Sequence, residues 1–385
     1  MNFSLTEEQQ LIQDTAKRFA ESELAPVAEK LDQTKDKSIL LGNCKKMAEL
    51  GFMGLNIDAD YGGTQAGVVS FSLAITEIAK ACASTAVTMS VTNMVAEVIQ
   101  AMGTEEQKNR YLPKICSGEF AAGSFCLTEA GAGSDPASMR AKAVKTDNGY
   151  AISGTKQWIT SAEFAGVFVV WAVTDPDARK GKGITCFLVD ADAAGITVGP
   201  SEHKMGQHGS ATNEVHFDNV EVSESAILGK LNDGFRLAVA ELAGGRIGIG
   251  SLALGVGLAA MEYAIAYTKE RQQFGQPLAN FQGLQWMIAD RSTELEAARL
   301  LLMSAADLKE RGLPFAKQAS MAKVFASEKA NDACYTALQL LGGYGYMQEY
   351  PLERLTRDVR ITSIYEGTSE IQRVIIAREI MREFD

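Results

Sequence analysis

The spacing of apolar residues predicts helices over the first third of the chain. Thr6 and Gln9 have the spacing of a capping box, which marks a helix start. Apolar residues then recur on one helical face, at positions 11, 12, 16, 19 and 20. Helical spacing returns over 70–81 and 105–112, beyond a turn signal at 61–63. Residues 1–120 are therefore expected to form an N-terminal α-helical domain.

The pattern changes near residue 121, where short segments rich in β-branched and aromatic residues begin. They cover 149–160, 166–173, 183–190 and 213–222, and Gly, Asp and Asn separate them. Such segments at this spacing are typical of an antiparallel sheet or barrel. Residues 121–228 are expected to form this middle β domain.

Long helical patterns return after residue 228, over 233–271, 282–311, 315–341 and 371–382. They predict a C-terminal domain that resembles a four-helix bundle and spans 229–385. Glycines at 248, 250, 255 and 257 lie within an apolar helical pattern, where small residues let helices approach closely.

The order of helices, strands and helices does not alternate, which predicts an α+β multidomain fold and argues against a Rossmann sheet. Residues 248–253 formally fit the dinucleotide-binding pattern G-x-G-x-x-A. No strand pattern precedes them, so we do not interpret them as a nucleotide fingerprint.

Composition narrows the class of partner. The 37 Lys and Arg residues against 48 Asp and Glu give a net charge of −11, which disfavours binding to nucleic acid. Six cysteines lie without CxxC spacing, so we expect reduced thiols and neither a zinc site nor disulfides. The histidines at 203, 208 and 216 fit no common zinc motif, and no metal is predicted.

Targeting signals are weak in this sequence. The first five residues lack the profiles of a signal peptide and of a transit peptide. The longest apolar stretch, 251–260, is too short to span a bilayer. We therefore expect no membrane span and a cytoplasmic bacterial protein, or a mitochondrial matrix protein if the chain is a mature processed form.

Five motifs in this order resemble the acyl-CoA dehydrogenase family, and the resemblance covers nearly all 385 residues. Its pattern is most similar to short-chain, or butyryl-CoA, dehydrogenases. The motifs are Leu-Thr-Glu-Ala-Gly-Ala-Gly-Ser-Asp at 127–135, Lys-Gln-Trp-Ile-Thr at 156–160, Arg-Gln-Gln-Phe-Gly at 271–275, Gln-Leu-Leu-Gly-Gly-Tyr-Gly at 339–345 and Ile-Tyr-Glu-Gly-Thr at 364–368.

The resemblance implies a homotetramer of three-domain subunits, with FAD between the β domain and the C-terminal helices. It places Phe125, Leu127 and Thr128 along the flavin ring, with Trp158 and Thr160 on the other side. It places Ser134 near the flavin phosphate and the coenzyme A chain. Thr368 and Glu370 would close the site, and the pyrophosphate and adenosine would contact a neighbouring subunit's Arg271, Phe274, Gln282, Gln339 and Gly343.

The residue types at two of these motifs suit phosphate binding independently of the resemblance. The glycine-rich stretch 131–134 offers backbone N–H groups, and Arg271 can contact a pyrophosphate with two hydrogen bonds. The alternatives are an ordinary glycine-rich turn and a surface arginine.

Glu366 is the predicted catalytic base. Flanked by Ile364, Tyr365 and Gly367, its carboxylate is expected to be desolvated, which would raise its pKa toward that of a useful base. Gly367 leaves room for the substrate carbon. By resemblance, the Glu366 N–H and a flavin hydroxyl bind the thioester oxygen, and the hydride passes to flavin N5. The alternative is a solvated loop glutamate.

Arg246 matches a family arginine near the thioester end of the substrate, and its alternative is a capping or salt-bridging arginine. Many relatives carry Asp three residues earlier, where this chain has Ala243. That departure leaves the contacts to the coenzyme A chain and the substrate preference open.

The resemblance implies FAD-dependent α,β-dehydrogenation of an acyl-CoA in fatty acid β-oxidation, with electrons passing to electron-transfer flavoprotein. The medium-sized residues over 88–94 favour short or medium straight acyl chains. A reductase acting on enoyl-CoA and an enzyme for branched, cyclic or aromatic acyl-CoA are alternatives on the same fold. A non-catalytic acyl-CoA-binding protein is an alternative of another class.

Overall fold

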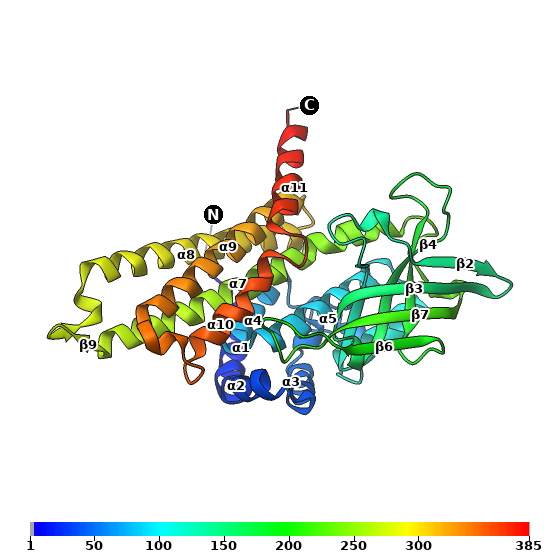
Figure 1. Cartoon of the computed structure of the whole chain (residues 1–385). Coiled ribbons are helices and arrows are strands. Elements are labelled where there is room, and N and C mark those ends of the chain that lie inside the picture. Colours follow the sequence, from blue (N-terminus) through cyan, green and yellow to red (C-terminus); the bar gives the residue numbers. More distant parts are fainter. Residues whose placement is uncertain (1–3, 385) are drawn as a thin grey trace.

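The computed structural model describes residues 4–384, and its first domain is helical (Figure 1). The expectation about a signal or transit peptide concerned the first five residues, of which residues 1–3 lie outside the described part. The capping box forms, because Thr6 Oγ1 accepts from Gln9 N at 3.2 Å and Gln9 Oε1 accepts from Thr6 N at 3.0 Å. The helices are α1 (Glu7–Phe19), α2 (Ala25–Thr34), α3 (Lys37–Glu49), α4 (Val68–Ala81), α5 (Ala83–Met102) and α6 (Glu105–Cys116).

The middle region is one eight-stranded sheet with the order β6-β7-β3-β2-β4-β5-β8, and β1 pairs with β4. The four predicted strands form as β3 (Gly149–Thr160), β4 (Ala165–Val173), β5 (Ile184–Asp190) and β7 (Thr212–Ser223). The sequence did not single out the shorter strands, which are β1 (Ala122–Cys126), β2 (Lys142–Thr146), β6 (Ile196–Ser201) and β8 (Ile227–Leu228).

Most strand pairs are antiparallel, as expected, but β4 pairs in parallel with β1 and, at one position, with β2. The β1 register runs from Ala122 beside Ala165 to Cys126 beside Val170. Strand β1 has only five residues, several of them small, so its sequence carries little strand signal. The parallel pairing places the end of β1 next to β4, at the side of the sheet where the predicted flavin residues lie.

The C-terminal region is built around α7 (Gly234–Glu270), which packs against α4, α5, α8 and α9. A Cβ on Gly250 would lie 2.6 Å from Leu302 Cδ2, and a Cβ on Gly257 would lie 2.9 Å from Leu295 Cδ2. These glycines therefore allow close helix packing, as predicted. The remaining elements are the hairpin β9 (Gln272–Gln273) and β10 (Gln276–Pro277), α8 (Gln282–Glu310), α9 (Ala316–Leu341), α10 (Pro351–Arg360) and α11 (Ser369–Arg382).

Helix α7 is long and apolar enough to cross a bilayer when judged by length and composition alone. Its apolar character extends well beyond the predicted stretch 251–260. However, 67% of its most apolar window is buried inside the protein, among the surrounding helices. The helix is therefore the core of the bundle. The G-x-G-x-x-A residues 248–253 lie inside it, without the strand that a nucleotide fingerprint requires.

The cysteines and histidines take structural positions. All six cysteines are buried and unpaired. His216 lies beside Glu214 at 2.6 Å, and His208 lies beside Asp32 at 3.1 Å. Within residues 4–384, no three His, Cys, Asp or Glu side chains gather closely enough to hold a metal ion.

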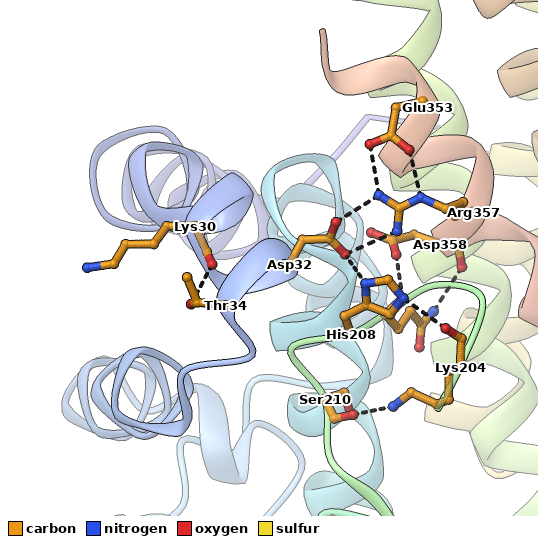
Figure 2. A network of polar contacts seen from close by, with 10 residues as sticks. Lys30, Asp32, Thr34, Lys204, His208, Ser210, Glu353, Arg357 and Asp358 are labelled. Atoms are coloured by element: carbon orange, nitrogen blue, oxygen red, sulfur yellow. Dashed lines mark hydrogen bonds and ion pairs between the residues drawn. The ribbon is translucent and has the colours of Figure 1, made fainter. Parts of the chain in front are cut away.

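A charged network joins all three regions of the chain (Figure 2). Asp32 on α2 accepts hydrogen bonds from Arg357 on α10 and lies beside His208 in the loop between β6 and β7. Arg357 also donates to Glu353 at 2.7 Å. This network borders a hollow of ≈ 660 Å³ that contains none of the predicted site residues. Its charged groups pair with one another, which suits a structural junction.

Candidate functional site

The main chain at Glu366 has an unusual conformation. Glu366 and Gly367 both have left-handed backbone angles, with φ of 55° and 87°. The turn follows α10 and the short 3-10 helix Ile361–Ser363 and precedes α11. Such a conformation is costly for a residue with a side chain, and it is found mostly where the surrounding structure imposes it. Thr368 then caps α11, because its Oγ1 accepts from Ile371 N at 3.3 Å.

The Glu366 carboxyl group points toward helix α7. Its Oε2 atom is buried and has no hydrogen-bond partner among the described residues. A Cβ on Gly245 would lie 2.9 Å from this Oε2 and 2.9 Å from Met94 Sδ. Gly245 therefore provides the space in which the carboxyl group stands. Burial raises the pKa of Glu366 to about 7, against the opposing effect of Arg246 and Lys323.

Two buried cations stand near this carboxyl group. Arg246 is 5% exposed and donates from Nη1 to Ser320 Oγ at 3.4 Å, while its Nε atom has no partner among residues 4–384. Burial lowers its pKa, and the charge of Glu366 acts in the opposite direction. Lys323 is fully buried and donates to the Gly367 carbonyl oxygen at 2.8 Å. Arg246 lies in the interior of α7, away from both ends of that helix.

The residues predicted along the flavin ring gather at one place. The Gln157 N–H donates to the Thr128 carbonyl oxygen at 2.9 Å, so β3 runs beside the segment that follows β1. Thr160 is tied to β1 in the same way, because its carbonyl oxygen accepts from Ser124 Oγ at 2.7 Å. Leu127 is buried, and the partly buried Phe125 ring packs on Trp171 with centroids 4.3 Å apart.

Trp158 has the geometry of an exposed stacking surface. It lies at an irregularity in the pairing of β3 with β7, between Lys156 and Ile159, and its φ is 56°. A bulge re-aims a side chain out of the regular alternation. The indole is accordingly 57% exposed, although its neighbour Ile159 is buried. A large flat ring at this position could cover a planar ligand.

A buried ion pair that the sequence analysis did not identify supports this part of the site. Lys156 is fully buried, and its Nζ lies 2.9 Å from Glu129 Oε1 and 3.1 Å from the Leu127 carbonyl oxygen. Glu129 also accepts from the N–H groups of Arg140 and Ala141. Both residues belong to quoted motifs, but their pairing across 27 positions leaves no local sequence signal. The pair fixes the segment that leads into the glycine-rich turn.

The glycine-rich turn itself is open to solvent. A Cβ on Gly131 or Gly133 would meet nothing within 4 Å, and Ser134 is exposed. The Ala132 N–H is taken, because it donates to the Glu129 carbonyl oxygen at 3.0 Å. The cradle predicted for phosphate therefore has Gly131, Gly133 and Ser134 as its remaining donors.

The residues predicted to contact the adenosine end lie elsewhere in the subunit. Arg271, Gln339 and Gly343 line a hollow of ≈ 640 Å³. The Arg271 guanidinium stands 5.6 Å above the Tyr344 ring. Phe274, in the hairpin, is 92% exposed, and Gln282 is exposed at the start of α8. The hairpin and the β domain occupy opposite ends of the molecule (Figure 1), so one subunit does not bring the two predicted groups together.

Other carboxyl groups near the site are already engaged or differ in setting. Glu97 pairs with Lys309 and accepts from Asn56 Nδ2 at 2.7 Å. Glu241 lies one turn before Gly245 on α7, and burial together with Glu97 raises its pKa to about 8. Glu370 is exposed in the first turn of α11. Glu366 differs from these three in having a buried oxygen without a hydrogen-bond partner.

Comparison with known proteins identifies the family. Family models match the N-terminal domain of acyl-CoA dehydrogenase over residues 6–119, the middle domain over 124–220 and the C-terminal domain over 232–381. The chain is 46% identical to an acyl-CoA dehydrogenase of Bacillus subtilis, over 98% of this chain and 99% of the relative. It is 43% identical to an acryloyl-CoA reductase (NADH) of Anaerotignum propionicum, over 99% of this chain and 96% of the relative.

Solved structures give the same result. Butyryl-CoA dehydrogenase of Megasphaera elsdenii superposes with a TM-score of 0.95 at 39% identity, covering 99% of this chain and 100% of that one. A chain from the structure of an electron transferring flavoprotein of Acidaminococcus fermentans superposes with a TM-score of 0.96 at 41% identity, with the same coverage. These matches confirm the predicted three-domain fold and its short-chain resemblance. The protein therefore belongs to the acyl-CoA dehydrogenase family of oxidoreductases.

Proposed function

We propose that this protein catalyses the FAD-dependent α,β-dehydrogenation of an acyl-CoA thioester to the trans-2-enoyl-CoA. The observation that carries the proposal is the Glu366 carboxyl group, whose buried Oε2 lacks a partner and whose pKa is raised to about 7. A base for an α-proton must be near neutrality and free to accept, and this group meets both conditions. Family membership supports the same reaction class.

In the proposed reaction, Glu366 takes the proton from the α-carbon and a hydride leaves the β-carbon, so that the new double bond forms between them. Bound FAD would supply the hydride acceptor at its N5 atom. The thioester oxygen would accept from the Glu366 N–H, which makes no hydrogen bond with any described residue. Arg246 and Lys323 would stabilise the carboxylate form of the base.

The predicted FAD contacts fit a site that is shared between subunits. The exposed Trp158 and the open turn at 131–134 suit the ring and phosphate of a flavin. The hollow at Arg271, Gln339 and Gly343 offers a cation and glycine backbone for pyrophosphate and adenosine. Because these two groups lie at opposite ends of one subunit, a single FAD could reach both only between two copies (Figure 1). This separation supports the proposed homo-oligomer, with a homotetramer as the family arrangement.

The first prediction concerns the cofactor. The purified protein is expected to show flavin absorbance and to release about one FAD per subunit on denaturation, because the proposed contacts are non-covalent. Chromatography of the supernatant distinguishes FAD from FMN. A well-folded preparation that releases no FAD would favour the alternative of a non-catalytic acyl-CoA-binding protein. Covalent flavin or FMN would contradict the proposed contact set.

The second prediction concerns the electron acceptor. We propose electron-transfer flavoprotein as the partner, which the superposition with a chain from an electron transferring flavoprotein structure supports. Flavin reduced by an acyl-CoA is expected to be reoxidised by this partner much faster than by oxygen or NAD. Rapid-mixing absorbance at the flavin band measures both rates. Rapid peroxide formation would instead identify an oxidase.

The same experiment tests the reverse reaction. The relative in Anaerotignum propionicum is an acryloyl-CoA reductase (NADH), and its 43% identity favours a reductase as the second candidate function. If NADH with the partner flavoprotein drives reduction of an enoyl-CoA faster than acyl-CoA drives the forward reaction, the physiological direction is reduction. The proposed setting is the bacterial cytoplasm, or the mitochondrial matrix for a processed chain.

The proposed substrate is a short or medium straight-chain acyl-CoA. Helix α5 is almost entirely buried over 88–94, and its Met94 borders the space at Gly245. One helical turn farther along α7, Gly248 packs directly on Ser90 and Phe71. This contact narrows the space beyond Glu366 on that side, which supports a short acyl group. Branched, cyclic and aromatic acyl groups are the alternatives at the same site.

A further inference from the structure

We infer that two buried glutamines, Gln372 and Gln207, are positioning residues that hold the Glu366 turn from two different domains. The inference rests on the proposed role of Glu366 as the base. Neither glutamine makes a hydrogen bond to the Glu366 carboxyl group. Gln372 binds the main chain, and Gln207 binds the neighbouring Tyr365. Their role would be to fix where the carboxyl group points.

The need for such a device comes from the strained backbone. Two successive left-handed residues, Glu366 and Gly367, form the turn, and a non-glycine residue in this region is unfavourable unless the surrounding structure holds it there. Without restraint, Glu366 would relax toward a commoner conformation. Its carboxyl group would then leave the space beside Gly245, where a misplacement of about 1 Å can lower a rate 10²-fold.

Gln372, on α11, holds the turn directly. Its Nε2 donates to the Glu366 carbonyl oxygen at 3.0 Å and to the Gly367 carbonyl oxygen at 2.9 Å. The side chain is fully buried, so water does not compete for these bonds. A Cβ at position 367 would lie 2.7 Å from the same Nε2, and therefore only glycine permits this contact. Lys323 on α9 adds its own bond to the Gly367 carbonyl oxygen.

Gln207, from the middle domain, holds the turn through Tyr365. Its Nε2 donates to the Tyr365 hydroxyl at 3.2 Å and to the Asp358 carbonyl oxygen at 3.1 Å. Its own backbone N–H donates to the Asp358 carboxylate. Gln207 is 4% exposed and comes from the loop between β6 and β7, so this bond links the middle domain to the residue before Glu366.

The charged network of Figure 2 fixes the loop that carries Gln207. The adjacent residue, His208, lies between Asp32 and the Lys204 carbonyl oxygen, at 3.1 and 2.8 Å. Asp32 is bound in turn by Arg357, the neighbour of Asp358. The loop and α10 are thus tied to each other and to α2. A rigid support of this kind is what a positioning bond requires in order to act on Tyr365.

The test compares isosteric variants that lose only hydrogen bonds. Gln372→Met is expected to keep FAD and to lower the rate of flavin reduction by acyl-CoA about tenfold, with a smaller change in KM. Gln107→Met is the matched control, because Gln107 is also buried and its Nε2 also donates to two carbonyl oxygens, those of Ser225 and Ile227. That control is expected to lower thermal stability while keeping the parent rate per bound flavin.

A second pair of variants tests the hydrogen bond between Gln207 and Tyr365. This test remains valid even if Gln372→Met fails to fold. Gln207→Met and Tyr365→Phe are each expected to slow flavin reduction a few-fold, and the double variant is expected to be no slower than the slower single one. Additive losses, or a parent rate in Tyr365→Phe, would contradict this part of the inference, since the two changes remove one shared bond.

Infrared spectroscopy provides a readout that does not depend on turnover. The carboxyl band of Glu366, identified by its loss in Glu366→Gln, is expected to titrate at a shifted pH midpoint in Gln372→Met and at the parent midpoint in Gln107→Met. A parent rate together with a parent midpoint in Gln372→Met would overturn the inference. If Glu366→Gln itself reduces flavin normally, the proposed base is wrong, and that outcome is distinct from a failure of the positioning role.

Discussion

Replacing Glu366 with Gln is expected to slow flavin reduction by a saturated acyl-CoA by a factor of about 10² to 10⁴. The change keeps the size of the side chain and the left-handed backbone, but the amide cannot accept the α-proton. Binding of the enoyl-CoA product is expected to persist, because the N–H at 366 is unchanged. Stopped-flow bleaching of the oxidised flavin absorbance measures the rate.

The control for this prediction is a second buried carboxyl group. Glu241 lies one turn from Gly245 and has a pKa raised to about 8, so it is the strongest competitor for the role of base. Glu241→Gln is expected to leave flavin reduction within a few-fold of the parent. If Glu366→Gln retains the rate and Glu241→Gln loses it, the base is Glu241.

Folding stability offers an independent check on the same variant. The folded-state pKa of Glu366 lies above the value of about 4.5 that a solvated glutamate has, so the folded protein binds this proton more tightly than the unfolded chain. Its contribution to stability is therefore lost as pH rises through the window from about 4.5 to 7. Glu366→Gln cannot ionise and is expected to melt no lower than the parent at pH 8, as calorimetry would measure. A much lower melting temperature would mean that the change disturbs the fold as well as the proton transfer.

The sequence predicts regular elements best where they are long or clearly patterned. Helices α7, α8 and α9 begin and end within a residue or two of the expected limits, because each carries a long, continuous helical pattern. Strand β3 matches its prediction, whereas β1 and β6 have five and six residues and too little alternation to detect. The parallel pairing of β1 with β4 is a long-range choice that no local pattern records.

The candidate site divides in the same way. Motifs identify Glu366, Arg246 and Trp158 because they occur in recognisable local contexts. The sequence alone does not reveal the residues that hold these three in place. Lys323 bonds to Gly367 across 44 positions, and Gln207 bonds to Tyr365 across 158. Lys and Gln are usually exposed, so the sequence alone does not distinguish a buried Lys or Gln that has a specific partner from an ordinary surface residue.

The predicted FAD contacts fall into two groups that lie apart in one subunit. Arg271 and Gln339 line one hollow although they are 68 positions apart in the sequence, whereas Trp158 lies in the β domain at the other end of the molecule. A sequence motif specifies the type of contact and leaves open which copy of the chain provides it. In one subunit the hairpin and the β domain lie at opposite ends (Figure 1), so the proposed FAD site includes the proposed assembly.

Replacing Arg246 with Ala is expected to lower flavin reduction about 10- to 10³-fold at pH 7 and to move its pH midpoint upward. The reaction needs the carboxylate form of Glu366, whose pKa of about 7 means that the rate should fall tenfold per pH unit below neutrality. Arg246 is the largest influence that lowers this pKa. Removing a nearby opposite charge shifts a carboxyl pKa by about 1–3 units, so less carboxylate would be present at pH 7.

The pH dependence separates this electrostatic role from a structural one. In Arg246→Ala the rate is expected to recover toward the parent value at high pH, where Glu366 ionises despite the missing cation, while FAD content stays unchanged. Arg246→Lys keeps the positive charge and is expected to keep the midpoint near the parent value. Loss of the folded oligomer in the Ala variant would indicate a packing role. An unchanged midpoint with a slower rate at every pH would instead mean that Arg246 acts on the substrate, with Lys323 alone setting the charge state of the base.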